Sequence, residues 1–171
     1  MNCMYYQGLA ANFLEKVMEN WQHDAGSGRK VLVFCSPKEN VVANVSADSE
    51  QRFHSAYEIR NISFLRAIEV YYAATLSAAR ALTASLPFDD STNHIWLAVY
   101  GLFESHKLIG EYSAQGIGKT IASLVECTEN TILLGDVVSL DSDIPILNPS
   151  SISSRISAQS TQISSVLRRW V

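Results

Sequence analysis

The longest apolar stretch of the chain runs from Ile62 to Leu86, and it constrains the fold more than any other feature. Arg66, Glu69 and Arg80 interrupt it, whereas a helix that crosses a bilayer needs about 20 mostly apolar residues with few charges. The sequence therefore predicts no membrane span. At helical spacing the charged residues share one narrow stripe, and apolar residues cover most of the remaining circumference. We therefore expect one central helix over 63–85, buried on several sides.

Three further segments have the three-and-four spacing of apolar residues that indicates an amphipathic helix. The first runs from Leu9 to Trp21, the second begins at Ile95 and reaches Phe103, and the third is a short one from Ile121 to Val125. Each is expected to turn its apolar face toward the core.

Two pairs of β-branched, apolar runs are typical of short strands. Lys30–Cys35 and Val41–Val45 are separated by the turn-rich spacer Ser36–Asn40, which is short enough for an antiparallel hairpin. Thr131–Leu134 and Val137–Leu140 flank a Gly-Asp pair and are expected to form a second hairpin or strand pair. Because helices and strands do not alternate strictly in this interpretation, a doubly wound parallel sheet is not expected.

The predicted fold class is therefore α+β and helix-dominated, with an N-terminal helix, a β-hairpin, central helices, a short strand pair and a C-terminal amphipathic helix. Residues 1–149 are expected to form a single globular domain. In 150–171 nearly every polar residue is Ser, Thr or Gln, and the charges are Arg155, Arg168 and Arg169, a composition that a flexible tail also has. Apolar residues recur there at spacings of three, four and seven, which favours a helix that docks on this domain or on a partner. They are Ile152, Ile156, Ile163, Val166, Leu167 and Trp170.

The chain has 13 basic and 17 acidic residues, and charged residues make up only 18% of it. Its net charge of −4 lacks the basic field that supplies most non-specific affinity for nucleic acid, so we expect no nucleic-acid partner. The first residues show no secretory leader, and the three cysteines form no CxxC pair, which indicates reduced thiols. The expected location is the cytoplasm.

The segment of residues 113–120 ends in Gly-Lys-Thr, as a phosphate-binding loop does. In such a loop the amides around Gly116 and Gly118 hold phosphate, Lys119 reaches its terminal oxygens and Thr120 holds magnesium. The first glycine of the pattern is replaced by serine, and the acidic partner of the magnesium would be Asp136. The alternative interpretation is structural: the two glycines end one helix and let the next begin.

Cys35 closes an apolar run just before a turn, a position where α/β enzymes often present nucleophiles. A catalytic thiol needs a base, and the candidates are His54, His94 and His106. In the alternative interpretation Cys35 is a small, buried, apolar residue.

Glu69 is a second catalytic candidate, because Glu58 and several arginines accompany it. The combination with Arg60, Arg66 and Arg80 is typical of a polar pocket, and structural ion pairs explain it equally well. The histidines and cysteines show no metal-ligand spacing, so we expect no metal.

Low charge and apolar helix faces indicate a surface that is covered in an assembled state. We therefore expect a non-enzymatic protein–protein interaction protein (adaptor, inhibitor or regulatory protein) that acts through a helical surface and needs no cofactor. Ile156, Ile163, Leu167 and Trp170 are the predicted contacts with another protein or with a second copy. Two other classes stay open: a small phosphate- or nucleotide-binding protein that uses residues 113–120, and an enzyme that depends on a cysteine or a carboxylate.

Overall fold

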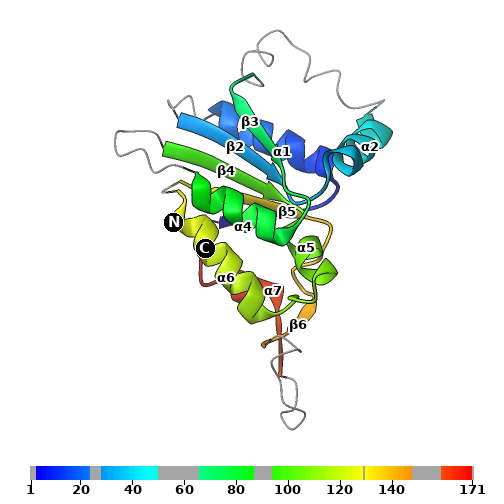
Figure 1. The fold of residues 1–171 in the computed structure, drawn as a ribbon, viewed down its shortest axis with the longest axis vertical. Coiled ribbons are helices and arrows are strands. Elements are labelled where there is room, and N and C mark those ends of the chain that lie inside the picture. The colour runs from blue at the N-terminus through cyan, green and yellow to red at the C-terminus, as the bar shows by residue number, and fades with distance from the viewer. Residues whose placement is uncertain are drawn as a thin grey trace.

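Five parallel strands form the central sheet, in the order β1-β5-β4-β2-β3 (Figure 1). They are β1 (Cys3–Gln7), β2 (Gly28–Phe34), β3 (Ile68–Tyr72), β4 (His94–Tyr100) and β5 (Ile132–Asp136). The computed structural model describes residues 3–23, 28–49, 66–86, 94–128, 130–147 and 159–170. A small antiparallel hairpin pairs β6 (Asp143–Pro145) with β7 (Ser160–Gln162). Helices alternate with the strands of the parallel sheet, so the fold is α/β with a Rossmann-like strand order.

Helices cover both faces of the sheet (Figure 1). One face carries α1 (Ala10–His23) and α2 (Lys38–Ser49), and the other carries α4 (Leu76–Ser85), α5 (Leu102–Leu108), α6 (Ala114–Glu126) and α7 (Ile163–Leu167). Side chains alternate along β2, so that Leu32 and Phe34 pack toward α1 while Val31 and Val33 pack toward the other helix layer. All five residues of β5 are buried, because both faces of the sheet are covered.

The predicted α+β fold is wrong, because the hairpin on which it depends does not form. Val41–Val45, expected as a strand, belongs to α2, in which the amides of Asn40 and Val41 donate to the Pro37 carbonyl at 3.1 and 3.2 Å. The strand expected at Lys30–Cys35 is present as β2, but it pairs in parallel with β3 and β4. Parallel partners need a crossover connection, and α2 provides it between β2 and β3.

The single helix expected over 63–85 is also wrong. Within its described part, Ile68–Tyr72 forms β3 at the edge of the sheet, and α4 begins only after Thr75, whose hydroxyl accepts the Ala78 amide at 3.1 Å. The strand sequence is β-branched and aromatic, which suits a pleated surface. A strand followed by a helix produces a continuous apolar pattern that resembles one buried helix. None of the helices in the described ranges combines the length and the hydropathy that crossing a bilayer requires.

Two further segments differ from the sequence prediction and two agree with it. The segment from Ile95 is β4, the middle strand of the sheet, and α5 starts only after it. The predicted second hairpin does not form, because β5 pairs in parallel with β1 and β4, and Val137–Leu140 is not a strand. The amphipathic helix expected at Leu9–Trp21 is confirmed as α1, and the short helix at 121–125 lies within α6.

The C-terminal segment packs on the domain where the structure describes it. Ile163 and Leu167 of α7 are buried in the core below α6. The amides of Ile163 and Ser164 donate, at 3.3 and 3.0 Å, to carbonyl groups of the loop before β6. Ile152, Ile156 and the predicted domain boundary lie outside the described residues.

Candidate functional site

A cleft of about 360 Å³ opens where the parallel strands end. Cys35 and Ser36 after β2, Gly101 after β4, Asp136 at the end of β5 and Asn40 of α2 are among the residues that line it. The connection after β2 leads to a helix on one face of the sheet, and the connection after β4 leads to helices on the other. In open α/β sheets, ligands bind outside the carboxyl ends of the strands at such a switch point. We call this hollow the carboxyl-edge cleft.

Hydrogen bonds to the backbone hold the strand ends that surround the cleft. The Cys35 amide donates to the Tyr100 carbonyl at 2.8 Å, and the Gly101 amide donates to the Gly135 carbonyl at 2.8 Å. The Ser105 hydroxyl donates to the Cys35 carbonyl at 2.8 Å. Gly101 has a φ of 79°, in the left-handed region that favours glycine, and this lets β4 turn directly into α5. The position of the cleft is therefore set by the backbone of the sheet.

Asp136 is the buried acidic group of the cleft. One carboxylate oxygen accepts the amides of Phe103 and Glu104 at 2.8 and 3.3 Å, and the other accepts the Val138 amide at 3.2 Å. Burial raises the pKa of Asp136, whereas the three amide hydrogen bonds oppose that rise. Asp136 therefore caps the first turn of α5, a different role from the magnesium ligand of the sequence prediction. Among the described residues, no three His, Cys, Asp or Glu side chains gather closely enough to hold a metal ion.

Cys35, the predicted nucleophile, lies in the same cleft as a buried thiol. Burial, and then the negative charge of Asp136, raise the pKa of Cys35 to about 12, so the thiol is protonated at neutral pH. Of the predicted bases, His54 and the side chain of His94 lie outside the described residues, and the His106 ring contacts α6 instead. The interpretation of Cys35 as a small apolar residue accounts for these observations.

Gly116, Gly118, Lys119 and Thr120, the predicted phosphate-binding residues, all lie inside α6. The helix begins at Ser113, whose hydroxyl caps it by accepting the Gly116 amide at 3.1 Å. The Gln115 amide donates to the carbonyl of Ile146, just after β6, and the Ile117 amide donates to the carbonyl of Ser113. These amides are therefore not free to bind phosphate. Residues 114–120 therefore form the start of a capped helix in place of an open loop, and the glycines do not separate two helices.

Thr120 belongs to a polar network that joins α4, α5 and α6. Arg80 donates to Thr120 Oγ1 through Nε and Nη2 at 3.1 and 2.9 Å, and it pairs with Glu111 Oε2 at 3.0 Å. His106, which is fully buried, contacts Thr120 Oγ1 through Nε2 and the Glu111 carbonyl through Nδ1, both at 3.1 Å. A carbonyl only accepts, so Nδ1 carries the proton and Nε2 is left as an acceptor. Burial lowers the pKa of His106 to about 4, and the Arg80 charge adds to this effect, so the ring is neutral.

Glu69 and Arg80, which the sequence analysis places in one cluster, have different partners in the structure. Glu69 on β3 accepts hydrogen bonds from Arg29 on the neighbouring strand β2, at 2.6 and 2.7 Å. The hydrogen bonds from Arg29 lower the pKa of Glu69. Glu58 and Arg60 lie outside the described residues. Glu69 is therefore a partner in an ion pair at the edge of the sheet, a structural role in place of the predicted catalytic one.

Three of the four predicted partner-binding residues contact the domain itself. Ile163 and Leu167 are buried in the core, and Trp170 packs against it while partly buried. Ile156 lies outside the described residues. Ile163 and Leu167 are therefore covered by the domain itself, the first of the two docking surfaces that the sequence analysis left open.

The chain matches a protein-family model along nearly its whole length. The model, described as SPAC22G7.03-like, covers residues 11–171, from within α1 through α7, and thus the strands β2, β4 and β5 that end at the cleft. No curated protein matches the chain.

Proposed function

We propose that this chain, which belongs to the SPAC22G7.03-like family, is a non-catalytic interaction domain that binds a partner protein at its carboxyl-edge cleft. The observation that carries the proposal is a set of five exposed apolar side chains, of which two line the cleft and three are next in sequence to lining residues. Leu108 and Val137 line it, and Leu108 is 79% exposed. Leu9, Val42 and Ile109 are each next in sequence to a lining residue and are about half exposed. We call these five residues the apolar rim.

Covering the apolar rim would stabilise a complex. Single exposed apolar residues are ordinary, whereas several around one hollow are typical of a binding surface. Full burial of one such side chain contributes roughly 1.5–3 kcal/mol, so covering five that are about half exposed or more contributes several kcal/mol. Ser36, Asn40 and Asn44 inside the rim offer hydrogen bonds to the same partner.

The charges of the cleft favour a partner whose facing surface is neutral or basic. Glu104 and Asp136 are the charged residues among the described ones that line it, and both are acidic. A phosphate or nucleotide would meet this negative charge without a basic side chain to offset it. The protonated Cys35 thiol offers no nucleophile. Binding of a protein surface therefore agrees better with the lining than either alternative of the sequence analysis does.

The test is a pull-down with the full chain in which two residues of the apolar rim become charged. The double variant Leu108→Glu with Val137→Glu should lose its bound partner, because two carboxylates then replace apolar contacts. Val70→Glu on the edge strand β3 is the matched control, since Val70 is also exposed and does not line the cleft. It should retain the partner. Thermal unfolding checks that both variants fold.

The pull-down and a light-scattering measurement together test the proposal. A set of captured proteins that is the same for the wild type, the double variant and the control would refute the proposal. Light scattering adds the case of self-association: a dimer that the double variant converts to a monomer, and that Val70→Glu preserves, identifies the partner as a second copy of the chain.

A further inference from the structure

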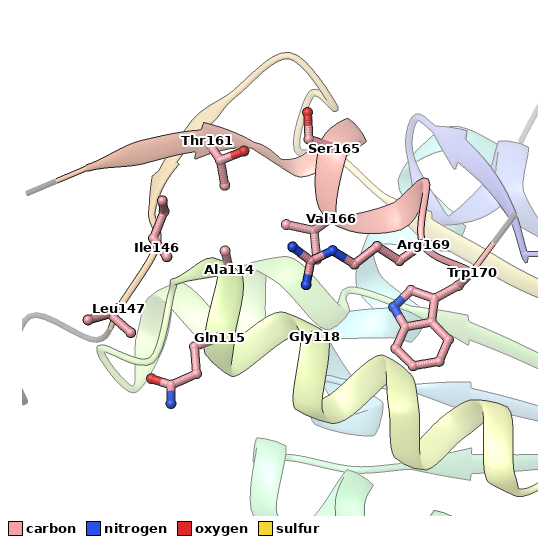
Figure 2. A pocket seen from close by; sticks show the side chains of 10 residues that line it. All are labelled: Ala114, Gln115, Gly118, Ile146, Leu147, Thr161, Ser165, Val166, Arg169 and Trp170. Atoms are coloured by element: carbon pink, nitrogen blue, oxygen red, sulfur yellow. The ribbon is translucent and has the colours of Figure 1, made fainter.

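A second hollow, of about 400 Å³, lies between α6, α7 and the strands β6 and β7 (Figure 2). Gly118 forms part of its α6 wall, and Val166 and Ile146 contribute apolar surface. The walls are joined by backbone bonds: the Gln115 amide donates to the Ile146 carbonyl at 3.0 Å, and the Ile146 amide donates to the Gln159 carbonyl at 2.9 Å. We call this hollow the α6–α7 groove.

Arg169 gives the groove its charge. Among the described residues that line the groove, it alone is charged. Figure 2 shows its guanidinium reaching back over Val166 toward α6. The fork of N–H donors on a guanidinium matches the two oxygens of a carboxylate.

The indole N–H of Trp170 is a second polar feature of the groove. The ring lines the groove, yet Nε1 is closed off from solvent and has no acceptor among the described residues. Figure 2 places this nitrogen on the ring edge that is turned toward Gly118. A buried donor without an acceptor costs about 1–3 kcal/mol, and a ligand whose acceptor reaches Nε1 as the ring shifts on binding would recover that cost.

We propose that the α6–α7 groove binds a small carboxylic acid with an apolar chain. The carboxylate pairs with Arg169 and accepts the indole N–H of Trp170, and the chain of the ligand lies on Ile146, Leu147 and Val166. A volume of about 400 Å³ falls in the range of small-ligand sites. One arginine suits a single negative charge better than the two of a phosphate monoester. This proposal uses none of the residues of the carboxyl-edge cleft, so the experiments that test it are independent of those that test the proposed function.

The probe is decanoate, below the concentration at which it forms micelles, with decanol as the neutral control of equal chain length. Titration calorimetry on the full chain should give decanoate an affinity at least about tenfold higher than that of decanol, the gain expected from one charged hydrogen bond. In ¹H–¹⁵N spectra the indole signal of Trp170, assigned with Trp170→Phe, should shift on binding. The indole signals of Trp21 and Trp96 should not, since neither residue lines the groove.

Three variants locate the site. Arg169→Gln should weaken decanoate binding at least about tenfold, whereas Arg168→Gln, an exposed arginine that does not line the groove, should leave it unchanged. Gly118→Leu should abolish binding by filling the groove. A Cβ at Gly118 meets no atom closer than Val166 Cγ1 at 3.9 Å, so the first atom of the new side chain fits and the remainder extends into the groove. Thermal unfolding confirms the fold of each variant.

Several results would overturn the proposal. They are equal affinities for decanoate and decanol, equal losses in the Arg168 and Arg169 variants, or an indole signal of Trp170 that does not move. An apolar tetrapeptide with a free carboxyl terminus supplies the remaining comparison. If it binds more tightly than decanoate and with the same dependence on Arg169, the groove recognises a peptide terminus, and the assignment to a small acid is wrong.

Discussion

The carboxyl-edge cleft and the α6–α7 groove are similar in volume, about 360 and 400 Å³, but they differ in origin and in charge. The cleft lies where parallel strands end, a hollow that a sheet with this strand order provides by itself. The groove exists only because β7 and α7 return to pack against α6. Glu104 and Asp136 line the cleft, whereas Arg169 lines the groove. Charge, and not size, therefore separates the two hollows. Helix α5 contributes Glu104 to the lining of the cleft, and its His106 contacts α6, which forms a wall of the groove.

The two glycines of α6 differ in the space around them. Gly116 lies close to the backbone just before the helix, whereas Gly118 lines the open groove. Gly116→Ala should lower the free energy of unfolding by about 3 kcal/mol or more, because the new Cβ would lie 2.4 Å from the Glu111 carbonyl oxygen. Gly118→Ala has 3.9 Å of space to its nearest neighbour and should raise that free energy by up to about 1 kcal/mol, since alanine favours a helix interior. Urea unfolding measures both. Equal losses would mean that α6 does not run through these positions.

His106, which contacts α6 from α5, makes the stability of the protein sensitive to acid. Its pKa is about 4 in the folded protein against 6.5 ordinarily, so between these values the unfolded chain binds a proton that the folded chain does not. The free energy of unfolding should therefore fall as the pH is lowered from 6.5 to 4, by about 3 kcal/mol in all. Thermal unfolding across this range should show the fall in the wild type and lose it in His106→Gln. Parallel curves for the two proteins would contradict the buried neutral ring.

Substitutions of Asp136 measure how much this carboxylate stabilises the structure around the cleft. Asp136→Ala removes the acceptor of three amides and should lower the free energy of unfolding by about 2 kcal/mol, because buried donors are left without a partner. Asp136→Asn keeps one acceptor oxygen and should lose less. Decanoate binding in the groove should be unchanged in both variants. If Asp136→Ala costs nothing in urea unfolding, the carboxylate does not act as a cap and is available to a ligand.

The sequence predicts helix α1 and the positions of strands β2 and β5, but it predicts neither how the strands pair nor the type of the segments that form β3, β4 and α2. The amphipathic spacing of Leu9–Trp21 predicts α1, because α1 is apolar only toward the sheet. The strand β4, predicted as a helix, is covered on both faces, and a short, continuous apolar run is compatible with a strand and with a buried helix alike. Val41 and Val42 favour a strand by residue type, yet the crossover between parallel strands makes their segment a helix.

The candidate site can be predicted only in part from the sequence. Cys35 and Asp136 attract attention as residues that follow apolar runs, and both line the cleft. Their roles depend on the strand order, which places β4 between β2 and β5 and brings the start of α5 against Asp136. The contacts of His106 with Thr120 and of Arg80 with Glu111 join three helices, and no local spacing predicts them.

The smallest effect is expected at Glu111, on the partly exposed side of the His106 network. Its carboxylate pairs with Arg80 at 3.0 Å, and partly exposed pairs contribute little, so Glu111→Gln should cost less than about 1 kcal/mol. The Glu111 carbonyl that accepts from His106 is retained, but the negative charge that offsets Arg80 is lost. The pKa of His106 should therefore fall further, and the loss of stability on acidification should extend to lower pH than in the wild type. Glu19→Gln, which breaks the exposed Lys16 pair on α1, is the matched control and should leave the pH profile unchanged. Coinciding pH profiles for both variants would show that burial alone keeps His106 neutral and that the Arg80–Glu111 pair does not affect its pKa.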